Sequence, residues 1–169
     1  MSLLAFFGLS PASHALELGD AAPAPTATDQ DGAKVDLAAV YKKGPTLVYF
    51  YPKADTPGCT KEACSLRDSY IDLRASGVQV IGVSSDKPDS QKKFQTKYSL
   101  PFTLIADTDG AVAKAFDVPT MMGFAKRQSF IVKDGKIAWL DKNASTAQQA
   151  DDVRKALASL GVEIKGAKP

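Results

Sequence analysis

The sequence contains few residues of the kinds that hold metals or bind nucleic acid. Among its 169 residues there are only two cysteines and one histidine. A closed structural zinc site requires four such ligands, so no such site can be built from them. The formal charge is only +2, and basic and acidic residues are interleaved along the chain. We therefore expect no metal, no nucleic-acid partner and no polybasic membrane patch, and chemistry that depends on thiols, carboxylates or hydroxyls.

The start of the chain has an apolar run too short to cross a bilayer. Leu3 to Leu9 is far below the roughly 20 residues that a transmembrane helix needs. It is followed by Ser13-His14-Ala15, a small-x-small sequence of the kind that signal peptidase cuts. No basic residue precedes the run. Residues 1–15 are therefore interpreted as a signal segment of a protein exported to the bacterial periplasm or, alternatively, as an apolar tail on a cytoplasmic protein.

Residues 16–169 are predicted to form a single domain. The full sequence of 169 residues is 44% hydrophobic and 24% charged, which is ordinary globular composition. Residues 16–25 are rich in alanine and proline, so they should enter the domain as an extended arm. The turn signal Asp31-Gly32 then lies between residues 26–29 and 34–37, which predicts a small N-terminal hairpin.

The next part of the chain alternates between strand and helix patterns. Buried strands are predicted over residues 46–51, 78–83 and 102–106, with helices between them from Pro57 to Gly77 and over 88–98. This alternation favours parallel crossovers. A short helix over 111–116, an antiparallel hairpin of residues 129–132 and 136–140, and a last helix capped near Ser145 and stopped by Gly161 should follow. The expected fold class is α/β, a sandwich whose central mixed sheet has helices on both faces.

The segment from Pro52 to Cys59 joins the predicted central strand to a helix, where open α/β sheets bind ligands. Thr56 suits the N-cap position and Pro57 the first helical position, so Cys59 falls in the first turn, where backbone N–H groups are free. These donors and the positive end of the helix favour a nucleophilic thiolate. Cys59 also lies on the apolar stripe of the helix, where a cysteine is often only a small hydrophobic residue. The pattern alone leaves both interpretations open.

Several motifs resemble one family. Pro52, Thr56 and Cys59 have the Pro-x-x-x-Thr-x-x-Cys spacing of peroxiredoxins. Residues 51–64, which include a second cysteine at Cys64, resemble the bacterioferritin comigratory protein or Q-type subfamily. The resemblance extends to residues 18–23, to Ser84-Ser85-Asp86 and to the Arg127-x-Ser-Phe sequence. It therefore covers nearly everything from residue 16 onward.

The resemblance implies a thioredoxin-like fold and a thiol-dependent peroxidase that reduces hydrogen peroxide and organic hydroperoxides without a metal or organic cofactor. Cys59 is then the peroxidatic cysteine, which becomes a sulfenic acid. Thr56 and Arg127 hydrogen-bond the thiolate and peroxide oxygens, and Pro52 shields the site from water. Taken alone, Thr56 would be only a helix cap and Arg127 only a surface charge. Thioredoxin or a similar dithiol reductant is the implied partner, and the implied state is a monomer.

The resemblance makes Cys64 the resolving cysteine, but regular helix geometry separates it from Cys59. Five residues along a helix, their Cα atoms should lie roughly 8.6 Å apart. A disulfide spans about 7 Å at most. If Cys64 resolves the sulfenic acid, the first turns of the helix must unwind, and the alternative is an inert Cys64 and an external thiol. Two rival functions are a disulfide oxidoreductase, whose cysteines are normally two residues apart, and a redox-regulated holdase.

Overall fold

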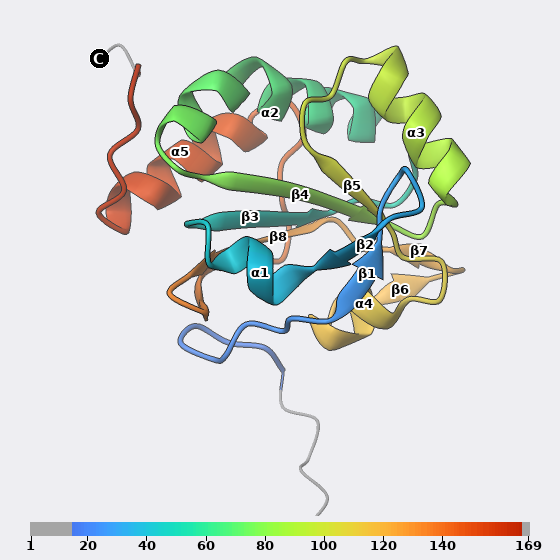
Figure 1. Ribbon diagram of the computed structural model, residues 1–169, viewed down its shortest axis with the longest axis horizontal. Helices are drawn as coiled ribbons and strands as arrows, with labels where there is room; N and C mark the ends of the chain where they lie inside the picture. Colours follow the sequence, from blue (N-terminus) through green and yellow to red (C-terminus); the bar gives the residue numbers. More distant parts are fainter. Residues whose placement is uncertain (1–14, 167–169) are drawn as a thin grey trace, which may run out of the picture.

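The computed structural model describes residues 15–166, so the predicted signal segment lies almost wholly outside the described residues. A five-stranded mixed sheet forms the middle layer of the domain (Figure 1). Its strand order is β5-β4-β3-β8-β9. The strands are β3 (Thr46–Phe50), β4 (Gln79–Ser84), β5 (Thr103–Ala106), β8 (Gln128–Lys133) and β9 (Lys136–Asp141).

Strand β3 lies at the centre of the sheet, as the continuous apolar run predicts, and all five of its residues are buried. It pairs in parallel with β4, which pairs in parallel with β5. On its other side β3 pairs antiparallel with β8, which forms a hairpin with β9. The two parallel crossovers and the antiparallel hairpin are therefore confirmed.

Helices cover both faces of the sheet (Figure 1). On one face lie α2 (Pro57–Ala75), α3 (Pro88–Lys97) and α5 (Gln149–Ser159). On the other lie α1 (Leu37–Tyr41), α4 (Ala111–Ala115) and the N-terminal hairpin of β1 (Thr26–Thr28) and β2 (Lys34–Asp36). Side chains alternate along β3, so Leu47 and Tyr49 enter the first core while Val48 and Phe50 enter the second. The predicted α/β sandwich is confirmed.

Apart from a turn at residues 18–20, the arm before the hairpin is extended, as its proline content predicts, and it covers the edge of the sheet at β9. The backbone N–H of Gly19 donates to the Ile137 carbonyl at 2.8 Å, and the Ile137 N–H donates to the Asp20 carbonyl at 2.9 Å. The Ala22 N–H donates to the Gly135 carbonyl at 2.9 Å. An exposed strand edge invites pairing with other chains, so the arm protects it.

Three local features differ from the sequence-based predictions. Helix α1 and a second hairpin of β6 (Thr120–Met121) and β7 (Phe124–Ala125) were not predicted, because each is only a few residues long. The expected cap of the last helix at Ser145 is wrong. Helix α5 begins at Gln149, and the Ser145 hydroxyl instead donates to the Asp152 carboxylate in its first turn at 2.5 Å.

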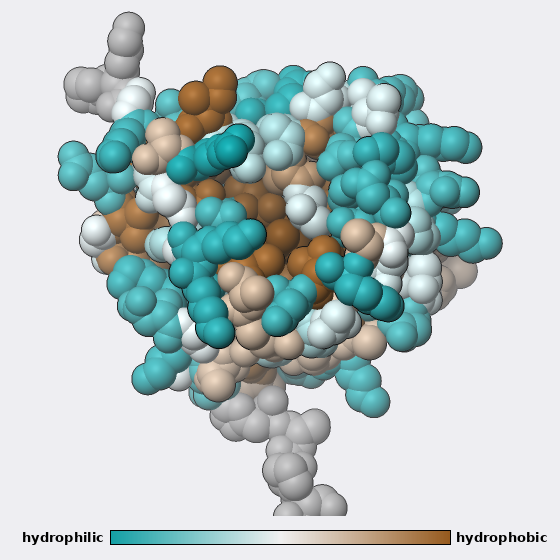
Figure 2. Space-filling view, viewed as in Figure 1, coloured by the Kyte–Doolittle hydropathy of each residue, from teal (hydrophilic) through white to brown (hydrophobic). Residues whose placement is uncertain are grey.

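The surface visible in Figure 2 is mostly hydrophilic, with apolar side chains gathered near the middle of the view at the level of the sheet. Within residues 15–166, no helix combines the length and the apolar character needed to cross a membrane.

Candidate active site

The loop between β3 and α2 places its side chains at the carboxyl ends of the parallel strands, as predicted. Thr56 occupies the N-cap position of α2 with extended backbone angles of −94° and 157°, and Pro57 begins the helix. The Thr56 hydroxyl does not cap the helix, however. It donates to the Lys53 carbonyl at 2.8 Å, inside the loop. The position of Thr56 is therefore as expected, but its hydroxyl bonds within the loop and accepts no hydrogen bond from the backbone N–H groups at the helix start.

Cys59 lies in the first turn of α2, and its side chain is only 2% exposed. The first backbone hydrogen bond of the helix runs from the Thr60 N–H to the Thr56 carbonyl at 2.8 Å. The N–H groups of Gly58 and Cys59 therefore precede the helical ladder and have no carbonyl partner within it. Together with the helix dipole, they make the surroundings of the sulfur electropositive.

Arg127, the residue directly before β8, reaches this helix end, although it is 68 positions from Cys59 in the sequence. Its Nη2 lies 3.3 Å from the Cys59 sulfur, at hydrogen-bonding distance. A methyl group in place of the Gly58 hydrogen would lie 3.3 Å from the same nitrogen, so glycine leaves room for the guanidinium. The fold thus brings two of the predicted site residues, Cys59 and Arg127, into contact.

Glu62 completes this cluster, one helical turn after Cys59. Its side chain is fully buried, and Oε2 forms an ion pair with Arg127 Nη1. Oε1 has no hydrogen-bond partner among the described residues. Burial raises the pKa of Glu62 to about 8, against the lowering effect of Arg127. Burial disfavours the Arg127 cation, but the charges of Glu62 and Cys59 outweigh this effect, so the pKa of Arg127 lies above its usual value.

Glu62 lies within the motif of residues 51–64, but nothing in that motif indicated more than a weak supporting role for it. A better signal was its position on the stripe of α2 that also contains Cys59, Ala63 and Leu66. A charged residue on an apolar stripe is rarely buried without a partner. That argument predicts a buried cation nearby, but it does not identify Arg127.

Two carboxylates bond the loop to neighbouring elements, one from the end of β4 and one from the loop itself. Asp86, which follows β4, accepts hydrogen bonds at Oδ2 from the Ala54 N–H at 2.8 Å and from the Ser84 hydroxyl at 2.7 Å. Asp55 bonds to Lys97 and Tyr98 at the end of α3. In the sequence, Asp86 is visible only as part of the Ser84-Ser85-Asp86 motif and Asp55 carries no signal, because nothing local indicates which element each side chain contacts.

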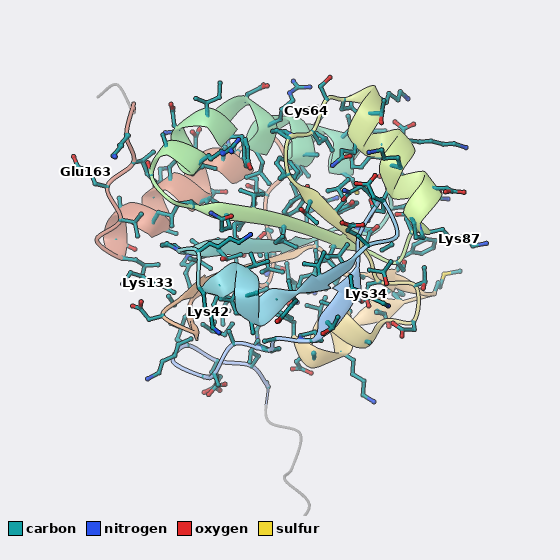
Figure 3. The ribbon with its side chains drawn as sticks, viewed as in Figure 1. Lys34, Lys42, Cys64, Lys87, Lys133 and Glu163 are labelled. Carbon is teal, nitrogen blue, oxygen red and sulfur yellow. The ribbon has the colours of Figure 1, made fainter. Side chains whose placement is uncertain are left out.

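The remaining predicted residues are near the site in the chain but make less specific contacts. Cys64 lies on α2 (Figure 3) and is partly exposed. It shares this unbroken helix with Cys59, and both thiols are free. Because the helix is continuous, the roughly 8.6 Å separation expected for their Cα atoms applies. Pro52 is partly buried and directly follows Tyr51 at the start of the loop.

The chain resembles known proteins in both sequence and structure. Residues 18–140 match the AhpC/TSA family. The chain is 44% identical over 131 residues to chloroplastic peroxiredoxin Q of rice (Oryza sativa subsp. japonica), covering 74% of this chain and 58% of the rice protein. It is 42% identical over 146 residues to peroxiredoxin Bcp of Escherichia coli K12, covering 82% of this chain and 93% of that protein. The crystal structure of peroxidoxin BcpB from Mycobacterium tuberculosis superposes with a TM-score of 0.80 and 30% identity, over 86% of this chain and 98% of that one.

Proposed function

The chain belongs to the AhpC/TSA family, within its peroxiredoxin Q and Bcp branch, and on this premise we propose that it is a thiol peroxidase with Cys59 as the attacking nucleophile. The observation that carries the proposal is the contact of 3.3 Å between Arg127 Nη2 and the Cys59 sulfur at the start of α2. A thiolate beside a guanidinium and free N–H groups is stabilised as an anion, and the same donors can hold an incoming oxygen.

In the first step the Cys59 thiolate attacks one oxygen of a hydroperoxide. A sulfur–oxygen bond forms as the oxygen–oxygen bond breaks, and the leaving oxygen takes a proton to become water or an alcohol. Cys59 is oxidised to a sulfenic acid, and the peroxide is reduced. Negative charge grows on the leaving oxygen in the transition state. Arg127 and the N–H groups of Gly58 and Cys59 are the donors that stabilise it.

Thr56 and Pro52 complete the pocket in this proposal. The Thr56 hydroxyl donates to the Lys53 carbonyl, so its oxygen keeps lone pairs that can accept a hydrogen bond from the peroxide. Pro52 presents a partly buried apolar ring at the start of the same loop, which keeps water from the sulfenic acid. Glu62 acts through Arg127, because its buried carboxyl group contacts Nη1, fixes that side of the guanidinium and leaves Nη2 for the sulfur.

In the second step Cys64 attacks the sulfenic sulfur, forming a disulfide and releasing water. A thioredoxin-like dithiol then reduces the disulfide to two thiols and is itself oxidised. Because α2 is unbroken and separates the two cysteines, this step requires the first turns of the helix to unwind. The intact helix supports peroxide attack before unwinding, because the reduced thiols are found in a folded helix whereas a disulfide between them needs an unwound one.

The test is stopped-flow oxidation of the reduced protein by hydrogen peroxide and by organic hydroperoxides, followed by mass spectrometry. Cys59→Ser should abolish peroxide consumption. Arg127→Ala should lower the second-order rate constant by about 100-fold or more, as loss of a transition-state donor does elsewhere. Cys64→Ser is the matched control, because it should still consume one equivalent of peroxide and stop at the sulfenic acid. Near-normal turnover by the serine variant at position 59 would overturn the proposal.

Residues 1–15 act, in this proposal, as a removable targeting segment of an exported peroxidase that works as a monomer. The match to the family begins only at residue 18, which supports a boundary near residue 16. Deletion of residues 1–15 should leave the melting temperature and the rate of Cys59 oxidation unchanged. N-terminal sequencing of the protein recovered from bacterial cells should find a chain that begins at residue 16. A mature chain that retains these residues would contradict the export assignment.

A further inference from the structure

The end of α3 contacts the loop before Cys59 through three polar groups. The Lys97 ammonium lies 2.9 and 2.8 Å from the two carboxylate oxygens of Asp55. The Tyr98 hydroxyl donates to Asp55 Oδ1 at 2.7 Å. The Lys97 ammonium also lies over the Tyr98 ring, 5.2 Å from its centre, so the two residues support each other's orientation. Lys97 and the Tyr98 hydroxyl also lower the pKa of the Asp55 carboxyl, which keeps it ionised.

The same end of α3 also contacts α2 beyond Cys64. Arg67 Nη1 donates to the Tyr98 backbone carbonyl at 2.8 Å. Asp55 and Arg67 thus bond to two groups of one residue, the side-chain hydroxyl and the backbone carbonyl of Tyr98, from opposite ends of a segment. That segment, residues 56–66, contains both cysteines. It is also the stretch that has to unwind before a disulfide can form between them.

We infer that Asp55, Lys97 and Tyr98 form a clamp, here called the α3 clamp, that holds the first turns of α2 folded and sets the rate at which Cys64 reaches the Cys59 sulfenic acid. The inference rests on the proposed disulfide step and adds positioning residues to it. While the clamp is closed, Cys59 stays beside Arg127 and ready for peroxide. When it opens, the helix start can unwind and the disulfide can form. The clamp therefore controls resolution, not peroxide attack.

The α3 clamp is exposed to solvent and therefore weak, so it can open often enough to control the rate of disulfide formation. The Lys97 and Asp55 side chains are 57% and 43% exposed, and such ion pairs are weak and screened by salt. A weak contact can break many times in each catalytic cycle without unfolding the domain. Losing it should speed disulfide formation by about threefold to tenfold, the range expected for one exposed charged pair and its hydrogen bond.

The backbone conformation at position 55 allows a variant that removes the charge with little strain. Asp55 has a φ of 59°, in the left-handed region that asparagine tolerates well and most other residues do not. Asp55→Asn therefore removes the charge with little backbone strain. Tyr98→Phe removes only the hydroxyl and keeps the ring. Asp31→Asn is the matched control, because Asp31 forms a similar ion pair of 2.7 Å with Lys92 on the same helix, and its own hydrogen bonds tie it to the N-terminal hairpin.

The experiment separates the two steps of the reaction in the full chain. One equivalent of hydrogen peroxide is added to the reduced protein, and rapid quenching followed by mass spectrometry gives the second-order rate of Cys59 oxidation and the first-order rate of disulfide formation. Asp55→Asn and Tyr98→Phe should raise the disulfide rate by about threefold to tenfold while the oxidation rate stays within about twofold. Asp31→Asn should change neither. Added salt should speed disulfide formation in the wild type but not in Asp55→Asn.

Faster resolution should also lower overoxidation, because a sulfenic acid that forms a disulfide quickly has less time to meet a second peroxide. In excess peroxide, the Asp55→Asn variant should therefore yield less Cys59 sulfinic acid than the wild type. An unchanged disulfide rate in both clamp variants, or an equal rise in Asp31→Asn, would overturn the clamp while leaving the peroxidase proposal intact. A wild type that forms no Cys59–Cys64 disulfide would instead remove the second step of the proposed function, and the clamp with it.

Discussion

The two faces of the central sheet differ in what they bury. The face under α1 and α4 contains three phenylalanines that pack on one another: Phe50 and Phe116 at 5.4 Å between ring centres, Phe50 and Phe130 at 5.9 Å, and Phe116 and Phe130 at 5.2 Å. Such aromatic groups contribute a large hydrophobic area and need no hydrogen-bond partner. This face, here called the phenylalanine face, serves stability.

The opposite face, under α2, α3 and α5, buries polar groups along with its apolar ones. Within residues 15–166, three buried side-chain atoms lack a hydrogen-bond partner: the Tyr49 hydroxyl, Glu62 Oε1 and Gln149 Oε1. All three lie on this face, here called the site face, which also holds Cys59. Figure 3 shows Cys64 on its helix layer, across the sheet from Lys42 and Lys133.

The difference shows that apolar packing for stability and the polar groups around Cys59 lie on opposite faces of the same sheet. An unpaired buried polar atom costs stability, so it persists only where something else requires it. For Glu62 the requirement is a carboxyl group that pairs with a guanidinium beside a buried sulfur. The apolar packing across the sheet offsets this cost. Variants on the two faces should therefore have different effects, one mainly on stability and the other on the reaction or its pH dependence.

The largest effect on stability is expected for Phe116→Ala on the phenylalanine face. Phe116 is 1% exposed, and truncating a buried phenylalanine costs about 3–5 kcal/mol. Urea unfolding should show this loss, while the second-order rate of Cys59 oxidation in the folded variant stays at the wild-type value. Ile71→Ala is the control, because Ile71 is 80% exposed and its loss should change stability by less than about 0.5 kcal/mol. A tenfold fall in the oxidation rate of Phe116→Ala would mean that the faces are not independent.

An intermediate effect is expected from Glu62 on the site face, as a dependence of stability on pH. The pKa of this carboxyl rises from 4.5 to about 8 in the folded protein, so between these values the folded protein retains a proton that the unfolded chain releases. The free energy of unfolding should therefore fall as pH rises from 4.5 towards 8, by at most about 1.4 kcal/mol per pH unit. Glu62→Gln has no such proton and should flatten this slope.

Urea titrations at several pH values between 5 and 8 measure this slope. Glu163→Gln is the matched control, since Glu163 is exposed and its variant should keep the wild-type dependence (Figure 3). An identical slope in the wild type and Glu62→Gln would show that Arg127 keeps the carboxyl ionised throughout this range, and that burial has the smaller influence on its pKa.

The smallest effect is expected from a pair of tyrosines on the site face. The Tyr51 hydroxyl donates to Gln91 Oε1 at 2.5 Å, so Tyr51→Phe leaves that oxygen unpaired and should cost about 1–2 kcal/mol. The Tyr49 hydroxyl has no hydrogen-bond partner in the part of the chain that the structure describes, so Tyr49→Phe should be neutral or stabilise the fold by up to about 1 kcal/mol. Thermal unfolding of both variants in parallel measures the difference. A loss of stability in Tyr49→Phe would reveal a hydrogen bond at that hydroxyl.

Local patterns were enough to predict most of the elements and the position of Cys59 in the first turn of α2. The run from Thr46 to Tyr51 predicted a buried central strand, because only a strand covered on both faces is continuously apolar. Pro57 and Gly77 marked the ends of α2, and the glycine has a φ of 80° there. Ser145 misled the prediction for α5, because a hydroxyl near a helix start can bond to a side chain of the helix as readily as to its backbone.

By itself the sequence determined that a cysteine would stand at the positive end of a helix beyond the central strand, because strand period, helix stripe and capping are local properties. Only the tertiary structure decided what surrounds that cysteine. Arg127 and Glu62 are 65 positions apart, and Asp55 and Lys97 are 42 apart, so their contacts exist only once β8 and α3 pack beside α2. Side-chain pairing across such distances depends on how the layers stack. The periodicity of the sequence therefore does not predict these pairs, whereas burial and interatomic distances in the folded domain identify them.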